Sequence, residues 1–175
     1  MKSSFSRRSF LQSVFAAGAA PLILPSRVWS AETKPNSRIS LGVIGLGKQA
    51  GGHVSGFMSR ADIQLVAVCD VDSNRRANAK RIVEENYAKK AESGFKGCES
   101  YNDFRELIAR KDIDAVVIVT PDHWHAPITV AAARAGKDIY CEKPLCETVH
   151  ESAAMVDAVR TVSYTHLTLP TKRIV

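Results

Sequence analysis

The chain has 175 residues, of which 45% are hydrophobic, and it carries 24 lysines and arginines against 18 acidic residues. Six of the basic residues lie near the two ends, so that residues 32–161 hold 18 basic and 18 acidic side chains. This balanced stretch has no surplus of positive charge with which to neutralise phosphates, and the composition therefore excludes nucleic acid as a partner.

Residues 1–31 have the pattern of a twin-arginine export signal. Arg7 and Arg8 precede a mildly apolar stretch that is too short to cross a bilayer as a stable helix. Small residues around Ser30 allow cleavage by a signal peptidase. We therefore expect a periplasmic or otherwise exported protein that uses the twin-arginine export machinery, with residues 32–37 as a polar linker. The alternative is a basic arm followed by an amphipathic helix.

Short apolar runs then alternate with longer amphipathic stretches, which is typical of βαβ units on a parallel sheet. Strands are expected at Ile39–Ile44, Ile63–Cys69, Gly97–Ser100, Ala115–Val119 and Asp138–Cys141. The first three helices are expected at Ala50–Ser59, at Asn74–Lys90 with Ser73 as its cap, and at Asp103–Arg110 with Asn102 as its cap. A fourth helix has Pro127 in its first turn and ends at Gly136. A fifth begins with a capping box formed by Thr148 and Glu151 and runs to about Thr161. The expected fold is α/β: a Rossmann-type doubly wound parallel sheet over residues 38–161, truncated before its last strand and before a C-terminal α/β domain.

Residues 162–175 do not continue the helical pattern that precedes them. They resemble a translated sequencing adapter, and we expect a non-native tail; the alternative is a strand-forming tail rich in Thr and Leu. Residues 32–161 number about 130, which is enough for one domain and short of a two-domain dehydrogenase.

The four cysteines, Cys69, Cys98, Cys141 and Cys146, form no C-x-x-C pair and lack metal-ligand spacing. Because two of them fall within or beside expected strands, we expect free thiols. The histidines have neither a carboxylate at ligand spacing nor a C-x-x-C companion, so the sequence indicates no metal site.

A glycine motif ends the first strand and opens the next helix, which is the context that a dinucleotide site requires. It consists of Gly45, Leu46, Gly47, Lys48, Gln49 and Ala50. Gly45 permits the tight turn, Gly47 lets the backbone approach a pyrophosphate, and Ala50 allows close packing of helix on strand. The anion would lie at the helix N-terminus. Asp70 ends the second strand 20 residues after Ala50, where its carboxylate can accept both hydroxyls of an adenosine ribose; the alternative is a glycine turn with a helix-capping aspartate.

Asp70 favours NAD as the cofactor, because its carboxylate repels the additional phosphate of NADP. Arg75 and Arg76 follow closely and could bind that phosphate instead. NADP therefore stays open as an alternative.

Two more loops are expected at the same edge of the sheet. They contain Thr120, Pro121 and His125 after the fourth strand, and Glu142, Lys143 and Pro144 after the fifth. Together with the glycine motif and Asp70, in this order and spacing, they resemble the Gfo/Idh/MocA family, named for glucose-fructose oxidoreductase, inositol dehydrogenase and a rhizopine-catabolism protein. The resemblance covers about residues 38–161, and Glu-Lys-Pro is its more specific element.

This resemblance implies that Thr120 and Pro121 line the nicotinamide-ribose side of the cofactor and that Glu142 contacts that ribose. Lys143 would be the catalytic residue facing the substrate hydroxyl, with a Lys143-Pro144 bond that is commonly cis. The chemistry agrees, because oxidation of an alcohol needs a proton acceptor, and a cation stabilises the developing alkoxide. The alternative is that Lys143 only pairs with a neighbouring acid.

The remaining aromatic and histidine side chains carry weaker expectations. His125 is included among the cofactor contacts, although a histidine at a helix start is more often a structural cap. One histidine of this loop, His123 or His125, could line the cleft, and Trp124 could form the wall of a sugar site. His53 is expected to be a packing or surface residue.

The expected function is that of an NAD-dependent oxidoreductase that transfers hydride between nicotinamide and a secondary hydroxyl of a sugar, cyclitol or polyol. One alternative is an NAD-dependent glycosidase that works by transient oxidation and elimination, and another is a dinucleotide-binding protein without turnover. Because free NAD is scarce outside the cytoplasm, an exported enzyme would keep and recycle its cofactor. The resemblance also implies a homo-oligomer for the full-length protein and further catalytic residues in the C-terminal domain, so the 175-residue chain itself is expected to be inactive.

Overall fold

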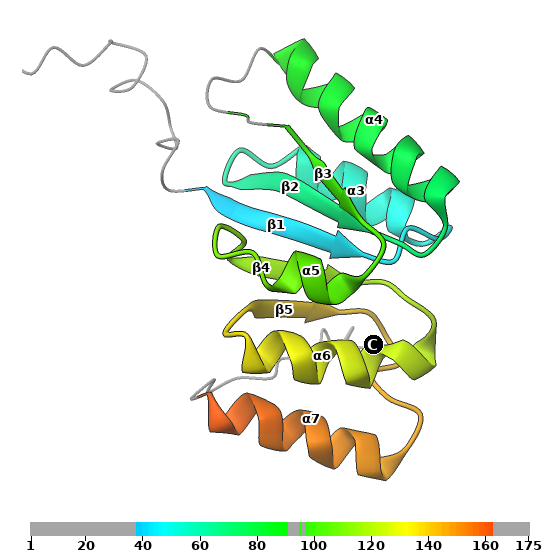
Figure 1. Ribbon diagram of the computed structural model, residues 1–175, viewed down its shortest axis with the longest axis vertical. Helices are drawn as coiled ribbons and strands as arrows, with labels where there is room; N and C mark the ends of the chain where they lie inside the picture. Colours follow the sequence, from blue (N-terminus) through cyan, green and yellow to red (C-terminus); the bar gives the residue numbers. More distant parts are fainter. Residues whose placement is uncertain (1–37, 91–94, 96, 163–175) are drawn as a thin grey trace, which may run out of the picture. The chain divides into compact units, whose positions relative to one another are not determined.

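The structure is a computed structural model that describes residues 38–90, 95 and 97–162. The expected export signal and linker, and residues 163–175 of the expected tail, lie outside the described residues. Within them, five parallel strands form one sheet in the order β3-β2-β1-β4-β5 (Figure 1). The strands are β1 (Ile39–Ile44), β2 (Ile63–Cys69), β3 (Glu99–Tyr101), β4 (Ala115–Ile118) and β5 (Asp138–Cys141).

Helices cover both faces of this sheet, as the apolar runs of its central strands require. They are α3 (Ala50–Met58), α4 (Ser73–Lys90), α5 (Phe104–Ile108), α6 (His125–Arg134) and α7 (Val149–Thr161), with a 3-10 turn η2 (Asp122–Trp124) before α6. Val43 and Val117 pack with α3 and α4 on one face, while Val116 and Ile118 pack with α5 and α6 on the other. Helix α7 packs beside α6, at the β5 end of the sheet (Figure 1).

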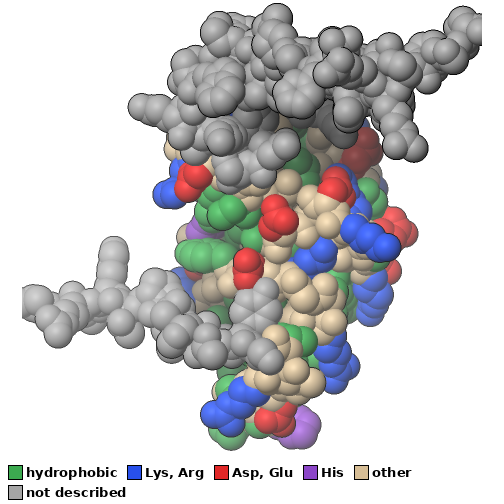
Figure 2. Space-filling view, turned by 90° about the vertical axis from the view of Figure 1, so that its left-hand side faces the viewer, with side chains coloured by type: hydrophobic (Ala, Val, Ile, Leu, Met, Phe, Trp, Pro, Cys, Tyr) green, Lys and Arg blue, Asp and Glu red, His purple; other side chains and the backbone are tan. Residues whose placement is uncertain are grey.

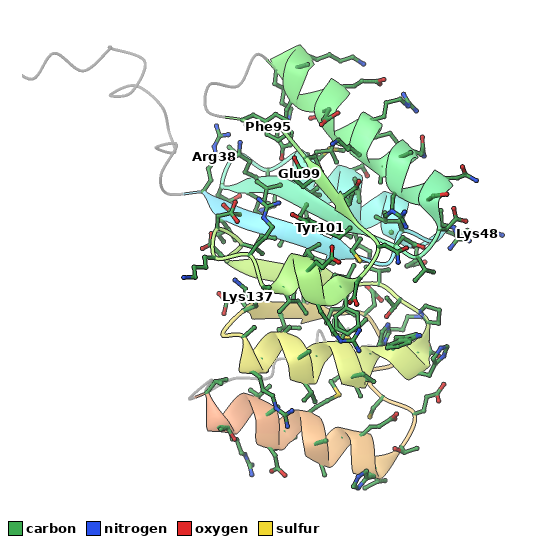
Figure 3. The ribbon with its side chains drawn as sticks, in the orientation of Figure 1. Arg38, Lys48, Phe95, Glu99, Tyr101 and Lys137 are labelled. Carbon is green, nitrogen blue, oxygen red and sulfur yellow. The ribbon has the colours of Figure 1, made fainter. Side chains whose placement is uncertain are left out.

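A crevice is expected at the edge of the sheet that the carboxyl ends of the strands form. The order reverses between β1 and β4, so their following loops diverge at the carboxyl ends of the strands, where ligands bind in open α/β sheets. Figure 3 shows Lys48 at this edge and Lys137 at the opposite one. Packing is tight behind the crevice, since a Cβ at Gly42 would lie 2.7 Å from the Leu107 side chain.

The sequence located the helices correctly but misidentified two of their caps. Helix α4 includes Ser73, and the carboxylate of Asp72 accepts the first backbone N–H groups in its place. Helix α5 is capped by Asp103, which accepts the N–H of Arg105, and not by Asn102. Carboxylates are good acceptors at helix N-termini, so a shift of one residue exchanges one suitable cap for another.

Buried polar groups at the opposite edge have their own partners. Lys137 is only 7% exposed, and its ammonium group donates to the carbonyl oxygens of Arg110 at 2.6 Å and Ile113 at 2.7 Å. On the face drawn in Figure 2, acidic and basic side chains occur side by side, in keeping with the balanced charge of residues 32–161. No helix among the described residues is both long and apolar enough to cross a membrane.

Candidate functional site

The turn after β1 is built around two glycines with different tasks. Gly45 has a φ of 90°, and a Cβ there would lie 2.6 Å from the carbonyl oxygen of Val119. The turn therefore needs glycine both for its backbone conformation and for its approach to β4. Above Gly47, by contrast, the nearest atom is the guanidinium of Arg75 at 4.0 Å, so open space lies over this backbone at the start of α3.

Asp70 is tied directly to this turn. One carboxylate oxygen accepts the N–H of Leu46 at 2.7 Å, and the other accepts the N–H of Asp72 at 2.9 Å. These bonds fix the carboxylate at the end of β2 beside the glycines. A carboxylate has about four acceptor positions, so Asp70 keeps capacity for the hydroxyls of a ligand.

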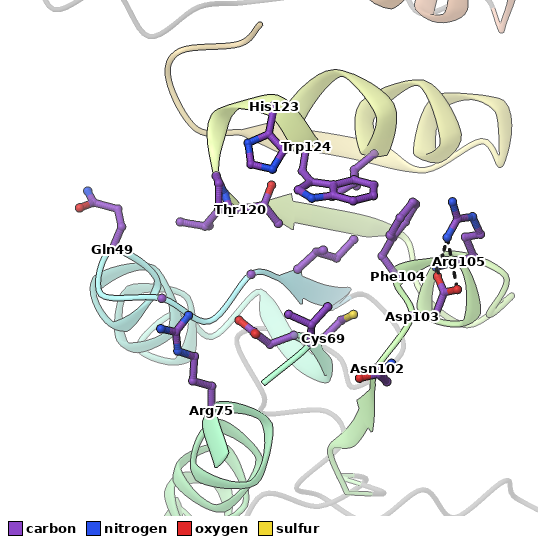
Figure 4. Close-up of a pocket in the computed structure, with 18 of the residues that line it drawn as sticks. Gln49, Cys69, Arg75, Asn102, Asp103, Phe104, Arg105, Thr120, His123 and Trp124 are labelled. Carbon is purple, nitrogen blue, oxygen red and sulfur yellow. Dashed lines mark hydrogen bonds and ion pairs between the residues drawn. The ribbon is translucent and has the colours of Figure 1, made fainter. Parts of the chain in front are cut away.

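A cavity of about 550 Å³ opens over the carboxyl ends of the strands (Figure 4). This volume is in the usual range for small-molecule sites. Its polar side includes Gly45, Gly47, Asp70 and Arg75. Of the residues that the sequence singled out as cofactor contacts, Lys48, Gln49, Thr120 and Pro121 also line it.

The opposite side of the cavity is apolar and aromatic. Phe104 and Trp124 meet edge to face with their ring centroids 6.1 Å apart, and the guanidinium of Arg105 lies 4.6 Å from the centroid of the Phe104 ring. Trp124, which the sequence suggested as the wall of a sugar site, lines the same cavity as Asp70. Phe104 and Arg105 were missed by the sequence analysis, although their position just after a predicted strand could have placed them at this edge.

Beneath the cavity, Cys69 is a buried neutral thiol. Burial raises its pKa to about 12, and the negative charge of Asp70 adds to this effect. A thiol with so high a pKa is a poor nucleophile, so this cysteine acts as a small apolar residue in the floor of the site.

His125 does not line the cavity. It is 1% exposed, and its ring nitrogens lie 2.6 Å from the carbonyl oxygen of Pro144 and 2.8 Å from that of Thr120. The histidine thus joins the loop after β4 to the loop after β5, which is the structural role that the sequence left open for it.

The Glu-Lys-Pro segment lies beyond the cavity, at the end of β5. The N–H of Glu142 donates to the carbonyl oxygen of Ile118 at 3.0 Å, so the segment begins beside β4. The Lys143-Pro144 peptide bond is cis. Lys143 is exposed, and no acid within residues 38–90, 95 and 97–162 forms an ion pair with it. Among the described residues, the alternative that Lys143 merely pairs with a neighbouring acid has no support.

No group of three or more histidine, cysteine or acidic side chains in the described part of the chain could hold a metal ion. The four cysteines are all free. The cavity itself is lined by backbone, by charged and polar side chains of several kinds, and by aromatic rings.

A doubly wound parallel sheet whose glycine turn, helix start and strand-end aspartate share one cavity is a Rossmann-type dinucleotide-binding domain. The open space over Gly47, which a Cβ would fill, fits the backbone approach of a pyrophosphate.

The comparison with known families agrees. The family described as "Oxidoreductase family, NAD-binding Rossmann fold" matches residues 39–167, and the chain belongs to this Gfo/Idh/MocA family.

Individual curated relatives and solved structures are similar to most of this chain. "Glycosyl hydrolase family 109 protein 2" of Shewanella sp. (strain ANA-3) is 32% identical over 89% of this chain and 37% of its own length. "Alpha-N-acetylgalactosaminidase" of Shewanella oneidensis is 31% identical over 86% of this chain and 36% of its own. Among solved structures, myo-inositol 2-dehydrogenase of Lactobacillus plantarum is 28% identical with a TM-score of 0.57, over 71% of this chain and 33% of that one. The chain thus spans little more than a third of the length of the curated relatives that it matches.

Proposed function

We propose that this chain is the dinucleotide-binding part of an enzyme that moves hydride between NAD and a secondary hydroxyl of a sugar, cyclitol or polyol. The observation that carries the proposal is the shared cavity, in which the glycine turn, the Asp70 carboxylate and an aromatic wall converge. Membership of an NAD-binding oxidoreductase family supports it. The cofactor, when bound, supplies the hydride acceptor.

The residues of the cavity divide the binding task. The backbone at Gly47 and the start of α3 would receive the pyrophosphate, and Asp70 would accept the adenosine ribose hydroxyls. The planar adenine base suits the wall formed by Phe104 and Trp124. We propose that NAD is preferred over NADP, because the Asp70 carboxylate would repel a 2′-phosphate.

Arg75 is the residue that could reverse this preference. Its guanidinium lines the same cavity, but it also lies 3.7 Å from a carboxylate oxygen of Asp72. This ion pair holds the positive charge of Arg75 near the start of α4 and partly neutralises it. Titration of the complete protein with both cofactors should give a smaller dissociation constant for NAD. Tighter binding of NADP would contradict the assignment to Asp70.

Lys143 is the proposed catalytic residue. Its exposed ammonium group, without an acid partner in the described residues, is available to a substrate hydroxyl at the end of β5. There it would hold the hydroxyl and either accept its proton or stabilise the alkoxide. Lys143→Met should abolish turnover in the complete protein while NAD affinity stays within about threefold.

A second candidate is an NAD-dependent glycosidase, which the names of the two Shewanella relatives favour. In such a cycle a sugar hydroxyl would be oxidised, the glycosidic substituent eliminated and water added to the resulting double bond; return of the hydride to the ketone would then complete the hydrolysis with no net consumption of NAD. The complete protein can be assayed with NAD on free sugars and cyclitols and on a chromogenic α-N-acetylgalactosaminide. Stoichiometric NADH indicates a dehydrogenase, and release of the aglycone without net NADH indicates the glycosidase. If neither product forms with any substrate of these classes, both candidates are wrong.

We also propose that the protein is exported by the twin-arginine machinery, on the basis of Arg7 and Arg8. Replacement of both residues by lysine should leave the protein in the cytoplasmic fraction. Unchanged fractionation would contradict the proposal. An exported protein would gain most from a cycle that regenerates its cofactor, which is a further argument for testing the glycosidase.

A further inference from the structure

A polar contact that the proposed function does not use joins helix α3 to the Glu-Lys-Pro segment. Nε2 of His53 lies 2.9 Å from a carboxylate oxygen of Glu142, and the two side chains are 18% and 15% exposed. The sequence led us to expect only a packing or surface role for this histidine. A hydrogen-bonded contact between two largely buried polar side chains matters for the elements that carry them, because the loss of one partner leaves the other desolvated and without a partner.

The carboxylate of Glu142 is oriented from several sides. The hydroxyl of Tyr140 donates to the same oxygen as His53 at 3.4 Å, and the backbone N–H of Lys143 donates to the other oxygen at 3.2 Å. The second of these bonds connects the carboxylate directly to the backbone of the proposed catalytic residue. A change in the orientation of the Glu142 carboxylate would therefore break or shift its hydrogen bond to the backbone of Lys143.

The imidazole of His53 is itself held by aromatic rings. It stacks on Phe57, one turn along α3, with centroids 6.3 Å apart and an interplanar angle of 22°. It also contacts Tyr140 of β5, with centroids 5.6 Å apart. Side chains whose rotamers are locked by packing can hold a neighbouring group to within a fraction of an ångström.

The strand order relates the contact between His53 and Glu142 to the path of a bound dinucleotide. Asp70 ends β2 on one side of β1, whereas Glu142 follows β5 on the other side. A dinucleotide that runs across the strand ends, with its adenosine at Asp70 and its pyrophosphate at the start of α3, directs its second ribose toward β4 and β5. Helix α3 thus begins at the pyrophosphate site and also carries His53, the residue that contacts the carboxylate of Glu142.

We propose that His53 is a positioning residue: it holds the carboxylate of Glu142 in place to accept a hydroxyl of the ribose distal to adenine, and it keeps the backbone of Lys143 beside that ribose. Of the about four acceptor positions on the carboxylate, the contacts described above use three, so one remains for a ribose hydroxyl and ribose binding does not require His53 to leave. This inference rests on the proposed function, because it presupposes a bound dinucleotide.

The test compares two ligands in the complete protein: NADH, which has the distal ribose, and ADP, which has only the adenosine and diphosphate. His53→Phe keeps a ring against Phe57 and Tyr140 but cannot donate a hydrogen bond to Glu142. We expect it to weaken NADH binding about tenfold and to change ADP binding less than twofold. His53→Gln, which presents an N–H donor at a similar reach, should restore NADH binding to within about threefold.

A double-mutant cycle supplies the second measurement. Glu142→Ala should weaken NADH but not ADP, and addition of His53→Phe to it should cause no further loss. Equal weakening of both ligands by His53→Phe would mean a general structural role, and full NADH affinity in this variant would mean no role; either result overturns the inference. If the unaltered protein binds neither ligand, the proposed function fails first and this inference falls with it.

Discussion

Replacement of Gly45 by alanine should destabilise the fold because of contacts that no side-chain rotation can relieve. The new Cβ would lie 2.6 Å from the carbonyl oxygen of Val119 and 2.7 Å from the nitrogen of Thr120, both of which are backbone atoms. The positive φ of 90° adds about 1–2 kcal/mol for an L-residue, and overpacking adds about 1–3 kcal/mol. We therefore expect the free energy of unfolding to fall by about 2–5 kcal/mol.

The same substitution at Gly47 should separate binding from stability. Its Cβ would find no atom nearer than the Arg75 guanidinium at 4.0 Å, so the free energy of unfolding should change by less than about 0.5 kcal/mol. The methyl group would instead occupy the space left for the pyrophosphate, and NADH affinity should fall roughly tenfold to a hundredfold. Gly51→Ala is the matched control, because nothing lies within 4 Å of that position in α3. It should leave affinity unchanged and add up to about 1 kcal/mol of stability.

Urea denaturation followed by circular dichroism, together with NADH titration by fluorescence, measures both quantities for all three variants. A Gly45→Ala protein that unfolds at the same urea concentration as the unaltered protein would show that the turn accepts a side chain. A Gly47→Ala protein that binds NADH with undiminished affinity would show that the pyrophosphate does not lie over this backbone.

Three further predictions concern a helix cap, a buried lysine and the buried thiols. Backbone N–H donors at the start of α7 hold the pKa of Glu151 below its ordinary value of 4.5, so its stabilisation should be present above that pH and be lost on further acidification. Thermal midpoints between about pH 3 and 6 should then fall more steeply in the unaltered protein than in Glu151→Gln. Lys137→Met should cost about 2–4 kcal/mol of unfolding free energy, because two buried carbonyl oxygens lose their donor. Burial raises the pKa of Cys69 and of Cys98 to about 12, so iodoacetamide at about pH 8 should modify neither in the folded protein, whereas the partly exposed Cys146 should react.

Each of these has a clear contrary result. Parallel pH profiles for the two Glu151 proteins would contradict the capping argument. A Lys137→Met protein as stable as its parent would show that the carbonyl oxygens find other donors. Alkylation of Cys69 as fast as that of Cys146 would mean that the floor of the cavity opens in solution, and a urea-unfolded sample provides the control for full labelling.

Much of the architecture could be predicted from local patterns. Strands buried on both faces must be continuous apolar runs, so Ile63–Cys69 was identified with its observed bounds. The turn at Gly45 requires a residue that tolerates positive φ, and the capping box of Thr148 and Glu151 satisfies N–H groups within a few residues along the chain. Such features depend on neighbours in sequence, which is why the sequence alone determined the fold class and the glycine turn.

The tertiary structure decided which side chains from separate elements meet. Phe104 lines the cavity because β3 ends at the same edge of the sheet as β2. His125 is buried because its ring lies between the carbonyl oxygens of Thr120 and Pro144, which belong to two different loops. The contact between His53 and Glu142 joins helix α3, which follows β1, to the segment after β5. Because β4 separates β1 from β5 in the sheet, no periodicity along the chain encodes this contact. Hydrogen bonds and packing act over a few ångströms in space, so the roles of these residues followed only once the strand order had brought them together.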